Sequence, residues 1–115
     1  MTSRESAPLC AVVEDDPTAR HLLRHWLEQA GYRVVEHTCG RSAIDDEQEA
    51  PAVACVDLGL DDIAGLSVIQ HLHARHPELP LIVVTAQREI ETAVEAMRAG
   101  AYDYVTKPLD RDRLI

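Results

Sequence analysis

The stretch VVEDDPTARHLL, residues 12–23, places three consecutive carboxylates directly after an apolar run. A continuous run of β-branched residues is typical of a strand that is covered on both faces of a parallel sheet. Pro17 suits the first position of a helix, and Asp16 suits the capping position before it. The stretch therefore predicts a buried strand, an acidic loop and a helix in direct succession.

The rest of the chain repeats this alternation of strands and helices. Covered strands are expected at 9–13, 53–56 and 81–84, and edge strands at 32–37 and 103–107. Helices are expected at 17–30, about 41–49, 66–76 and 90–99. The fourth helix would carry its apolar face on Ile90, Ala93, Val94 and Met97. This order predicts an α/β fold of the flavodoxin-like, doubly wound class, with a five-stranded parallel sheet in the order 2-1-3-4-5.

Length and composition narrow the function. The 115 residues suit a single domain, 1–115, and a fifth helix that begins near Asp110 is expected to be truncated at Ile115. A net charge of −9 argues against nucleic-acid binding by this segment, because phosphate contacts need clustered Lys and Arg. No signal peptide and no apolar run near the ~20 residues of a membrane span is visible, so the protein is expected to be cytoplasmic.

The cysteines do not suggest a metal or disulfide framework. Cys10, Cys39 and Cys55 are odd in number and lack the spacing of a metal site. Cys10 and Cys55 fall in apolar runs, so we expect them to be buried, reduced thiols.

The predicted sheet explains the carboxylates of the acidic loop. In such a sheet, ligands bind beyond the carboxyl ends of the strands. Glu14 and Asp15 follow the first strand and Asp57 follows the third, its neighbour at about 4.8 Å, so the three side chains should converge. Converging carboxylates need a cation or a proton, and oxygen ligands favour Mg²⁺, Ca²⁺ or Mn²⁺.

Two further strand ends point to phosphoryl chemistry. Thr85 closes the fourth strand, and Lys107 follows the fifth. A hydroxyl and an ammonium would thus face the same pocket as the carboxylates. Such a set can bind a metal and a phosphoryl group, with Asp57 as the central acceptor.

Four motifs at these strand ends resemble those of the receiver domain of two-component response regulators, the CheY-like family. They are VVEDDPTAR (12–20), VDLGLDDIAG (56–65), VVTA (83–86) and GAYDYVTKP (100–108). The resemblance covers nearly the whole chain, and the last part is similar to receivers of the NtrC class of transcription activators. One departure is Asp61, where the family usually has Pro.

The resemblance implies a role for each residue of the metal site. Asp15 would contact Mg²⁺ directly and Glu14 through water. Asp57 would accept the phosphoryl group and also bind the metal. The backbone carbonyl of Gly59 would complete the protein ligands.

The resemblance also implies a switch. Thr85 and Lys107 would bind the phosphoryl oxygens, and Tyr104 would turn inward when Thr85 moves toward them. The Lys107–Pro108 bond would be cis.

The partners implied are a sensor histidine kinase and an output domain, or another effector, outside this chain. The output would be transcriptional, and a homodimer is compatible with the family. The domain would be no enzyme beyond its own phosphorylation and dephosphorylation.

Three other functions share parts of this pattern. A phosphatase of the haloacid-dehalogenase type also uses an Asp nucleophile and Mg²⁺, but it carries a DxD pair where this chain has Glu-Asp-Asp-Pro. A flavodoxin-like cofactor protein needs a phosphate loop rich in Ser, Thr and Gly, and here that loop is acidic. A receiver that acts only as an unphosphorylated interaction module would differ by taking up no phosphoryl group.

Overall fold

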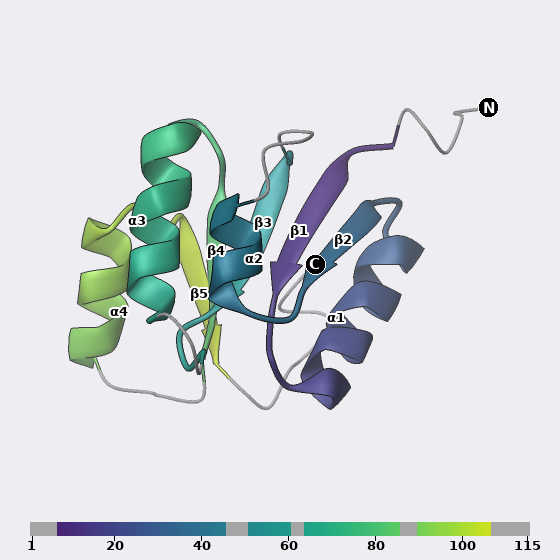
Figure 1. Cartoon of the computed structure of the whole chain (residues 1–115), viewed down its shortest axis with the longest axis horizontal. Helices are drawn as coiled ribbons and strands as arrows, with labels where there is room; N and C mark the ends of the chain where they lie inside the picture. The colour runs from purple at the N-terminus through teal and green to yellow at the C-terminus, as the bar shows by residue number, and fades with distance from the viewer. Residues whose placement is uncertain (1–6, 46–50, 61–63, 86–89, 107–115) are drawn as a thin grey trace.

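The computed structural model describes residues 7–45, 51–60, 64–85 and 90–106. Within these ranges five parallel strands form one sheet in the order β2-β1-β3-β4-β5, which confirms the predicted topology (Figure 1). The strands are β1 (Leu9–Val13), β2 (Arg33–His37), β3 (Val53–Asp57), β4 (Leu81–Thr85) and β5 (Asp103–Thr106). The helices are α1 (Pro17–Gln29), α2 (Gly40–Asp45), α3 (Gly65–Arg75) and α4 (Ile90–Arg98).

The sheet separates two apolar layers. On one face, α1 packs against the central strands through Leu23, Leu27, Cys10, Val12, Cys55 and Val84. On the other face, α2, α3 and α4 contribute Ala43, Ile44, Val68, Ile69, Leu72 and Ala96 to the larger cluster. Because successive strand residues point to opposite faces, a strand covered on both sides must be apolar at every position. The central strands β1, β3 and β4 are therefore continuously apolar, apart from Asp57 and Thr85 at the carboxyl ends of β3 and β4.

The register of the strands brings the acidic loop and β3 to one edge. Val13 lies opposite Val56, so Glu14 leaves β1 at the level where Asp57 ends β3. The sequence pattern predicts Asp57 just after the third strand, but in the structure it is the last residue of β3. Its backbone still pairs with Val84 of β4.

Helix α1 begins and ends as predicted. The Asp16 carboxylate accepts hydrogen bonds from the amides of Thr18 and Ala19 at 3.4 and 3.3 Å. After the last turn, Gly31 adopts a φ of 101°, a left-handed conformation that Gly tolerates without a Cβ penalty. The helix boundaries therefore follow from local chemistry.

The apolar residues of α1 form a stripe along the helix, and only part of this stripe is buried. Leu23 and Leu27 are buried, whereas Leu22 is 37% exposed and Trp26 is only partly buried. The place of Trp26 on the apolar stripe of the helix predicts that it lies in the core. This prediction is wrong in part, because the sheet covers only one side of the helix.

The residues predicted to form the apolar face of α4 are not its buried ones where the structure describes their side chains. Val94 and Met97 are 40% and 45% exposed, whereas Ala96 is fully buried. Within the described residues, α4 packs against α3 and β5, and the small side chain of Ala96 lies on the buried side. The side chains of Ile90 and Ala93 lie outside the described part.

Two predicted segments fall partly or wholly outside the described residues. Helix α2 is described to Asp45, and residues 46–50, which the prediction included in part, are not described. The truncated fifth helix, 110–115, also lies outside the described ranges. None of the described helices combines the length and apolar composition that a bilayer crossing requires.

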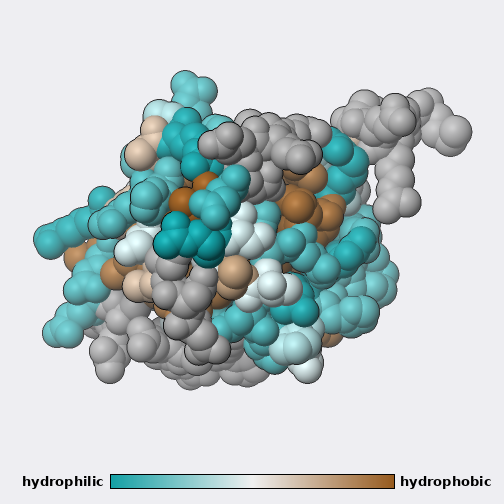
Figure 2. Space-filling model, in the orientation of Figure 1, coloured by the Kyte–Doolittle hydropathy of each residue, from teal (hydrophilic) through white to brown (hydrophobic). Residues whose placement is uncertain are grey.

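The surface is mostly polar in the view of Figure 2. Hydrophilic residues cover most of the described part of this face, and apolar atoms appear in separate patches. Among the described residues, the large hydrophobic side chains that are exposed are those of Leu22, Val94, Met97 and Tyr102.

Removing the cap should destabilise α1. Asp16→Ala deletes the acceptor for the amides of Thr18 and Ala19. Asp16→Asn loses the same charge but keeps a capping oxygen, so the difference between the two variants isolates the cap. We expect the Ala variant to be less stable than the Asn variant by about 1 kcal/mol in urea unfolding. Equal stabilities would show that the cap contributes nothing.

Candidate functional site

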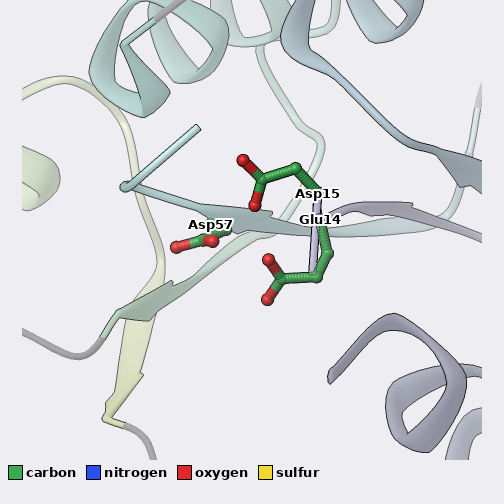
Figure 3. Close-up of side chains that lie close together, drawn as sticks. All are labelled: Glu14, Asp15 and Asp57. Atoms are coloured by element: carbon green, nitrogen blue, oxygen red, sulfur yellow. The ribbon is translucent and has the colours of Figure 1, made fainter. Parts of the chain in front are cut away.

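Three carboxylates meet at the carboxyl edge of the sheet, as the strand ends predicted. Glu14, Asp15 and Asp57 each place a carboxylate oxygen within 4.8 Å of the others (Figure 3). Glu14 is fully buried and Asp57 is 6% exposed, while Asp15 is partly buried. The convergence is confirmed, and it concentrates negative charge where little water screens it.

The main chain of the acidic loop is held in place by hydrogen bonds. The amide of Glu14 donates to the carbonyl of His37, at the end of β2, at 3.0 Å. The amide of Asp16 donates to Glu14 Oε2 at 3.3 Å. The buried His37 ring in turn lies 2.8 Å from Ser42 Oγ through Nδ1. The loop is thus tied to the neighbouring edge strand.

The segment after Asp57 is also ordered by its backbone. The amide of Leu58 donates to the carbonyl of Val84 at 3.2 Å, which extends the ladder with β4. The amide of Gly59 donates to Asp57 Oδ1 at 3.0 Å and so orients that carboxylate. Gly65, at the start of α3, donates to the carbonyl of Leu58 at 3.3 Å. These bonds fold the chain back over the end of β3.

The donor set fits a hard divalent cation. All three side chains offer oxygen, the ligand type that Mg²⁺, Ca²⁺ and Mn²⁺ prefer. A cation among them would offset the repulsion that their proximity creates. Among the residues that the structure describes, this is the one group of three or more side chains that could bind a metal ion together. His21 and His25 lie one turn apart on α1 and could also bind a metal, but both are exposed and belong to no such group.

The remaining predicted site residues are placed only in part. Thr85 is the last residue of β4 and is buried, one position beyond the partner of Asp57. Tyr104 lies in β5 opposite Val83, half-buried and packed against the larger apolar cluster. Lys107, Pro108 and Asp61 lie outside the described residues.

The thiols stand apart from this site. Cys10 and Cys55 are free and buried on the α1 side of the sheet, and Cys39 is a free thiol of intermediate exposure. A hydrogen bond with Cys55 and burial raise the pKa of the Cys10 thiol far above its usual range. The prediction of buried, free thiols at positions 10 and 55 is therefore confirmed, and burial disfavours the reactive thiolate form of Cys10.

A side chain at Gly65 should disturb the site. A Cβ there would lie 2.4 Å from Leu58 Cα and 2.5 Å from the Asp57 carbonyl oxygen, whereas a Cβ at Gly59 would lie 3.7 Å from Asp57 Oδ1. We expect Gly65→Ala to lower the free energy of unfolding by about 2 kcal/mol or more, and Gly59→Ala by less than about 1 kcal/mol. Chemical denaturation measures both, and similar losses would contradict the close approach.

Removing one carboxylate should stabilise the metal-free chain. Asp57→Asn keeps the shape of the side chain but removes one charge from the cluster. We expect the free energy of unfolding in EDTA at neutral pH to rise by about 1–2 kcal/mol. Asp45→Asn, an exposed change on α2, removes the same charge elsewhere and serves as the control. An equal gain in the control would mean that net charge, not crowding, sets the effect.

Comparison with known proteins agrees with this geometry. The family model for the response regulator receiver domain matches residues 10–115. Regulatory protein LuxO of Vibrio vulnificus (strain YJ016) is 39% identical over 104 residues, which are 90% of this chain and 23% of that protein. Transcriptional regulatory protein ZraR of Escherichia coli (strain K12) is 37% identical over 105 residues, which are 90% of this chain and 24% of that protein.

The fold has a close structural counterpart. The BeF3-activated receiver domain of DrrB from Thermotoga maritima superimposes with a TM-score of 0.88 at 32% identity, covering 94% of this chain and 91% of that one. The chain spans about a quarter of the length of the curated relatives it matches. The predicted similarity to regulators of the NtrC class agrees with the matches to LuxO and ZraR. The strand order, the acidic edge and these matches together show that the chain belongs to the receiver domains of two-component response regulators.

Proposed function

We propose that this chain is a switch in which Asp57 accepts a phosphoryl group from a phosphohistidine of a sensor histidine kinase. The convergence of Glu14, Asp15 and Asp57 carries the proposal, because it sets a buried acceptor beside two further carboxylates that can hold a cation. The match to a receiver domain described as activated by BeF3 supports it, since BeF3 bound to an oxygen ligand is tetrahedral, as a phosphoryl group is.

We assign Mg²⁺ as the cation. Asp15 and Asp57 would bind it directly, Glu14 through a water molecule, and the Gly59 carbonyl would be the remaining protein ligand. Mg²⁺ takes few protein ligands and keeps several waters, so two carboxylates and one carbonyl suit it. When bound, it would neutralise charge on the transferring group.

In the transfer step, an Asp57 carboxylate oxygen would attack phosphorus. The new O–P bond forms as the P–N bond to the kinase imidazole breaks, and the imidazole leaves with the bonding electron pair. The Thr85 hydroxyl and the Lys107 ammonium would then bind the phosphoryl oxygens. Preorganised donors of this kind stabilise charge as it develops, which is the main means of catalysis in phosphoryl transfer.

The acyl phosphate would shift an equilibrium between two states of β4, α4 and β5. Thr85 would move toward the phosphoryl oxygens, and Tyr104, half-buried on the next strand, would turn inward into the space released. A modification shifts such an equilibrium only by its different affinity for the two states. The two states therefore differ most in the hydrogen bonds that reach the modified Asp57.

The switch would act on a partner beyond these 115 residues, which we treat as one receiver domain. The similarity to ZraR, a transcriptional regulatory protein, favours a transcriptional output, and phosphorylation would control it directly or through a homodimer. Nucleic-acid binding is assigned to the output part because this segment is acidic. Free cysteines suit the reducing cytoplasm.

The decisive test is the intact mass of the chain after incubation with Mg²⁺ and acetyl phosphate. We expect one phosphoryl adduct on the native chain and on Asp45→Asn, and none on Asp57→Asn or in excess EDTA. Uptake depends on the acceptor oxygen and on the cation that offsets its charge.

Two results would contradict the proposal. A folded native chain without an adduct would favour a receiver that acts only as an interaction module. Repeated turnover of a simple phosphomonoester would instead favour a phosphatase.

A further inference from the structure

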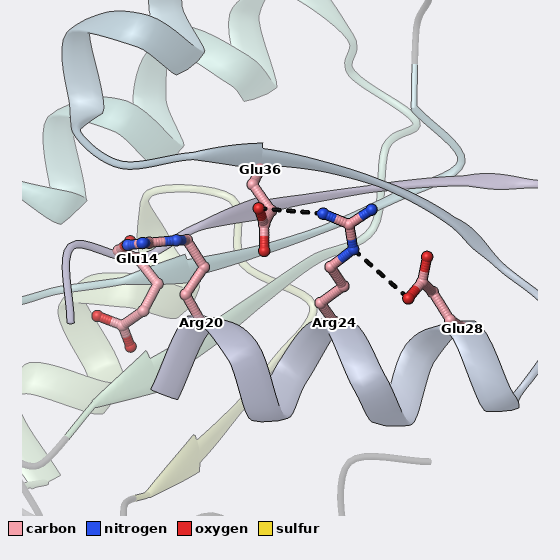
Figure 4. A network of polar contacts seen from close by, with 5 residues as sticks. All are labelled: Glu14, Arg20, Arg24, Glu28 and Glu36. Atoms are coloured by element: carbon pink, nitrogen blue, oxygen red, sulfur yellow. Dashed lines mark hydrogen bonds and ion pairs between the residues drawn. The ribbon is translucent and has the colours of Figure 1, made fainter. Parts of the chain in front are cut away.

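One cationic side chain of helix α1, that of Arg20, contacts the acidic loop at Glu14 and Asp15. Arg20 Nη1 donates a hydrogen bond to the main-chain carbonyl of Glu14 at 3.0 Å and a longer one to that of Asp15 at 3.5 Å. Figure 4 shows the Arg20 guanidinium beside Glu14. From the opposite side, the carbonyl of His37 accepts a hydrogen bond from the Glu14 amide at 3.0 Å. The backbone that carries both acidic side chains is thus held between α1 and β2.

We infer that Arg20 is a positioning residue for the acidic pair, an inference that rests on the proposed function of that pair. Both hydrogen bonds go to main-chain oxygens, so they turn the carbonyls of Glu14 and Asp15 toward α1. In the same loop, the two carboxylates point toward Asp57 (Figure 3). A hydrogen bond from a guanidinium is stronger than one between neutral groups, and it holds the loop against the repulsion of its own carboxylates.

The next turn of α1 provides a matched comparison. Arg24 forms ion pairs with Glu28 at 3.4 Å and with Glu36 of β2 at 3.2 Å (Figure 4). These contacts join α1 to β2 through side chains and do not involve the backbone of the acidic loop. Arg24→Ala therefore removes the same charge and a similar side chain from the same helix, without releasing the loop.

Removing Arg20 would have two opposite effects on the metal site. Release of the loop would misplace the ligands, whereas loss of a nearby positive charge would by itself strengthen cation binding. A measured affinity for Mg²⁺ would contain both effects and could not separate them. The rate constant for phosphorylation at saturating Mg²⁺ reports geometry, because occupancy of the metal site no longer limits it.

We expect Arg20→Ala to lower the phosphorylation rate constant at saturating Mg²⁺ by about tenfold, since small misplacements of reacting groups cost factors of this order. Acetyl phosphate is the donor, and intact mass is the readout. Arg20→Lys, which keeps a cationic donor within reach of the carbonyls, should recover most of the rate. Arg24→Ala should react like the native chain. Urea unfolding should give similar free energies of unfolding for Arg20→Ala and Arg24→Ala, so that the difference in rate does not come from global stability.

A second measurement does not depend on phosphorylation. Amide hydrogen exchange at Glu14 and Asp16 in the metal-free chain should accelerate by about tenfold in Arg20→Ala and stay unchanged in Arg24→Ala. A native rate of phosphorylation or unchanged exchange in Arg20→Ala would overturn the role of Arg20. If the native chain itself took up no phosphoryl group, the proposed function would fail, and the exchange data alone would decide whether Arg20 holds the loop.

Discussion

The mutual repulsion of three carboxylates at one edge of the sheet is the constraint on which the rest of the site depends. Glu14 and Asp57 are nearly excluded from water, and their oxygens lie close to those of Asp15. Such an arrangement costs free energy in the metal-free chain. It persists because other contacts hold the backbone at each strand end, among them the sheet ladder, the bond from the Glu14 amide to the His37 carbonyl and the bonds from Arg20.

The two loops of the site are held by different means. The loop after β1 is anchored to its neighbours, through the His37 carbonyl on one side and the Arg20 guanidinium on the other. The loop after β3 is held by close packing, because Gly65 sits almost against the backbone of Leu58, where no Cβ would fit. A cation or a phosphoryl group would therefore meet ligands that are already in place, and little reorganisation would accompany binding.

Much of this fold could be predicted because its signals are local or periodic. The continuous apolar strands, the Asp16 cap and the end of the first helix near residue 30 each depend on a few neighbouring residues, and the structure confirms them. The burial of particular helix faces was predicted less well. Ala96 faces the core of the molecule while Met97 is exposed, because burial depends on which surfaces lie opposite the helix rather than on its own pattern.

In the candidate site, too, some features could be predicted from the sequence and others could not. Glu14, Asp15 and Asp57 could be predicted to meet, since the rules for parallel sheets place the carboxyl ends of adjacent strands at one edge. The hydrogen bonds from Arg20 and to His37 could not, because they join residues through main-chain atoms, which leave no residue-type pattern in the sequence. A lone Arg one turn into a helix is also too common to signal such a contact.

By itself, the sequence determined the order of the elements, the class of the sheet and the three carboxylates at its edge. These follow from side-chain periodicity and from the general geometry of parallel strands. Only the tertiary structure decided how deeply Glu14 and Asp57 are buried, which helix faces meet the core, and which groups hold the acidic loop. The reason is physical: burial and main-chain contacts depend on the positions of elements far apart along the chain, which are defined only when all of them pack together.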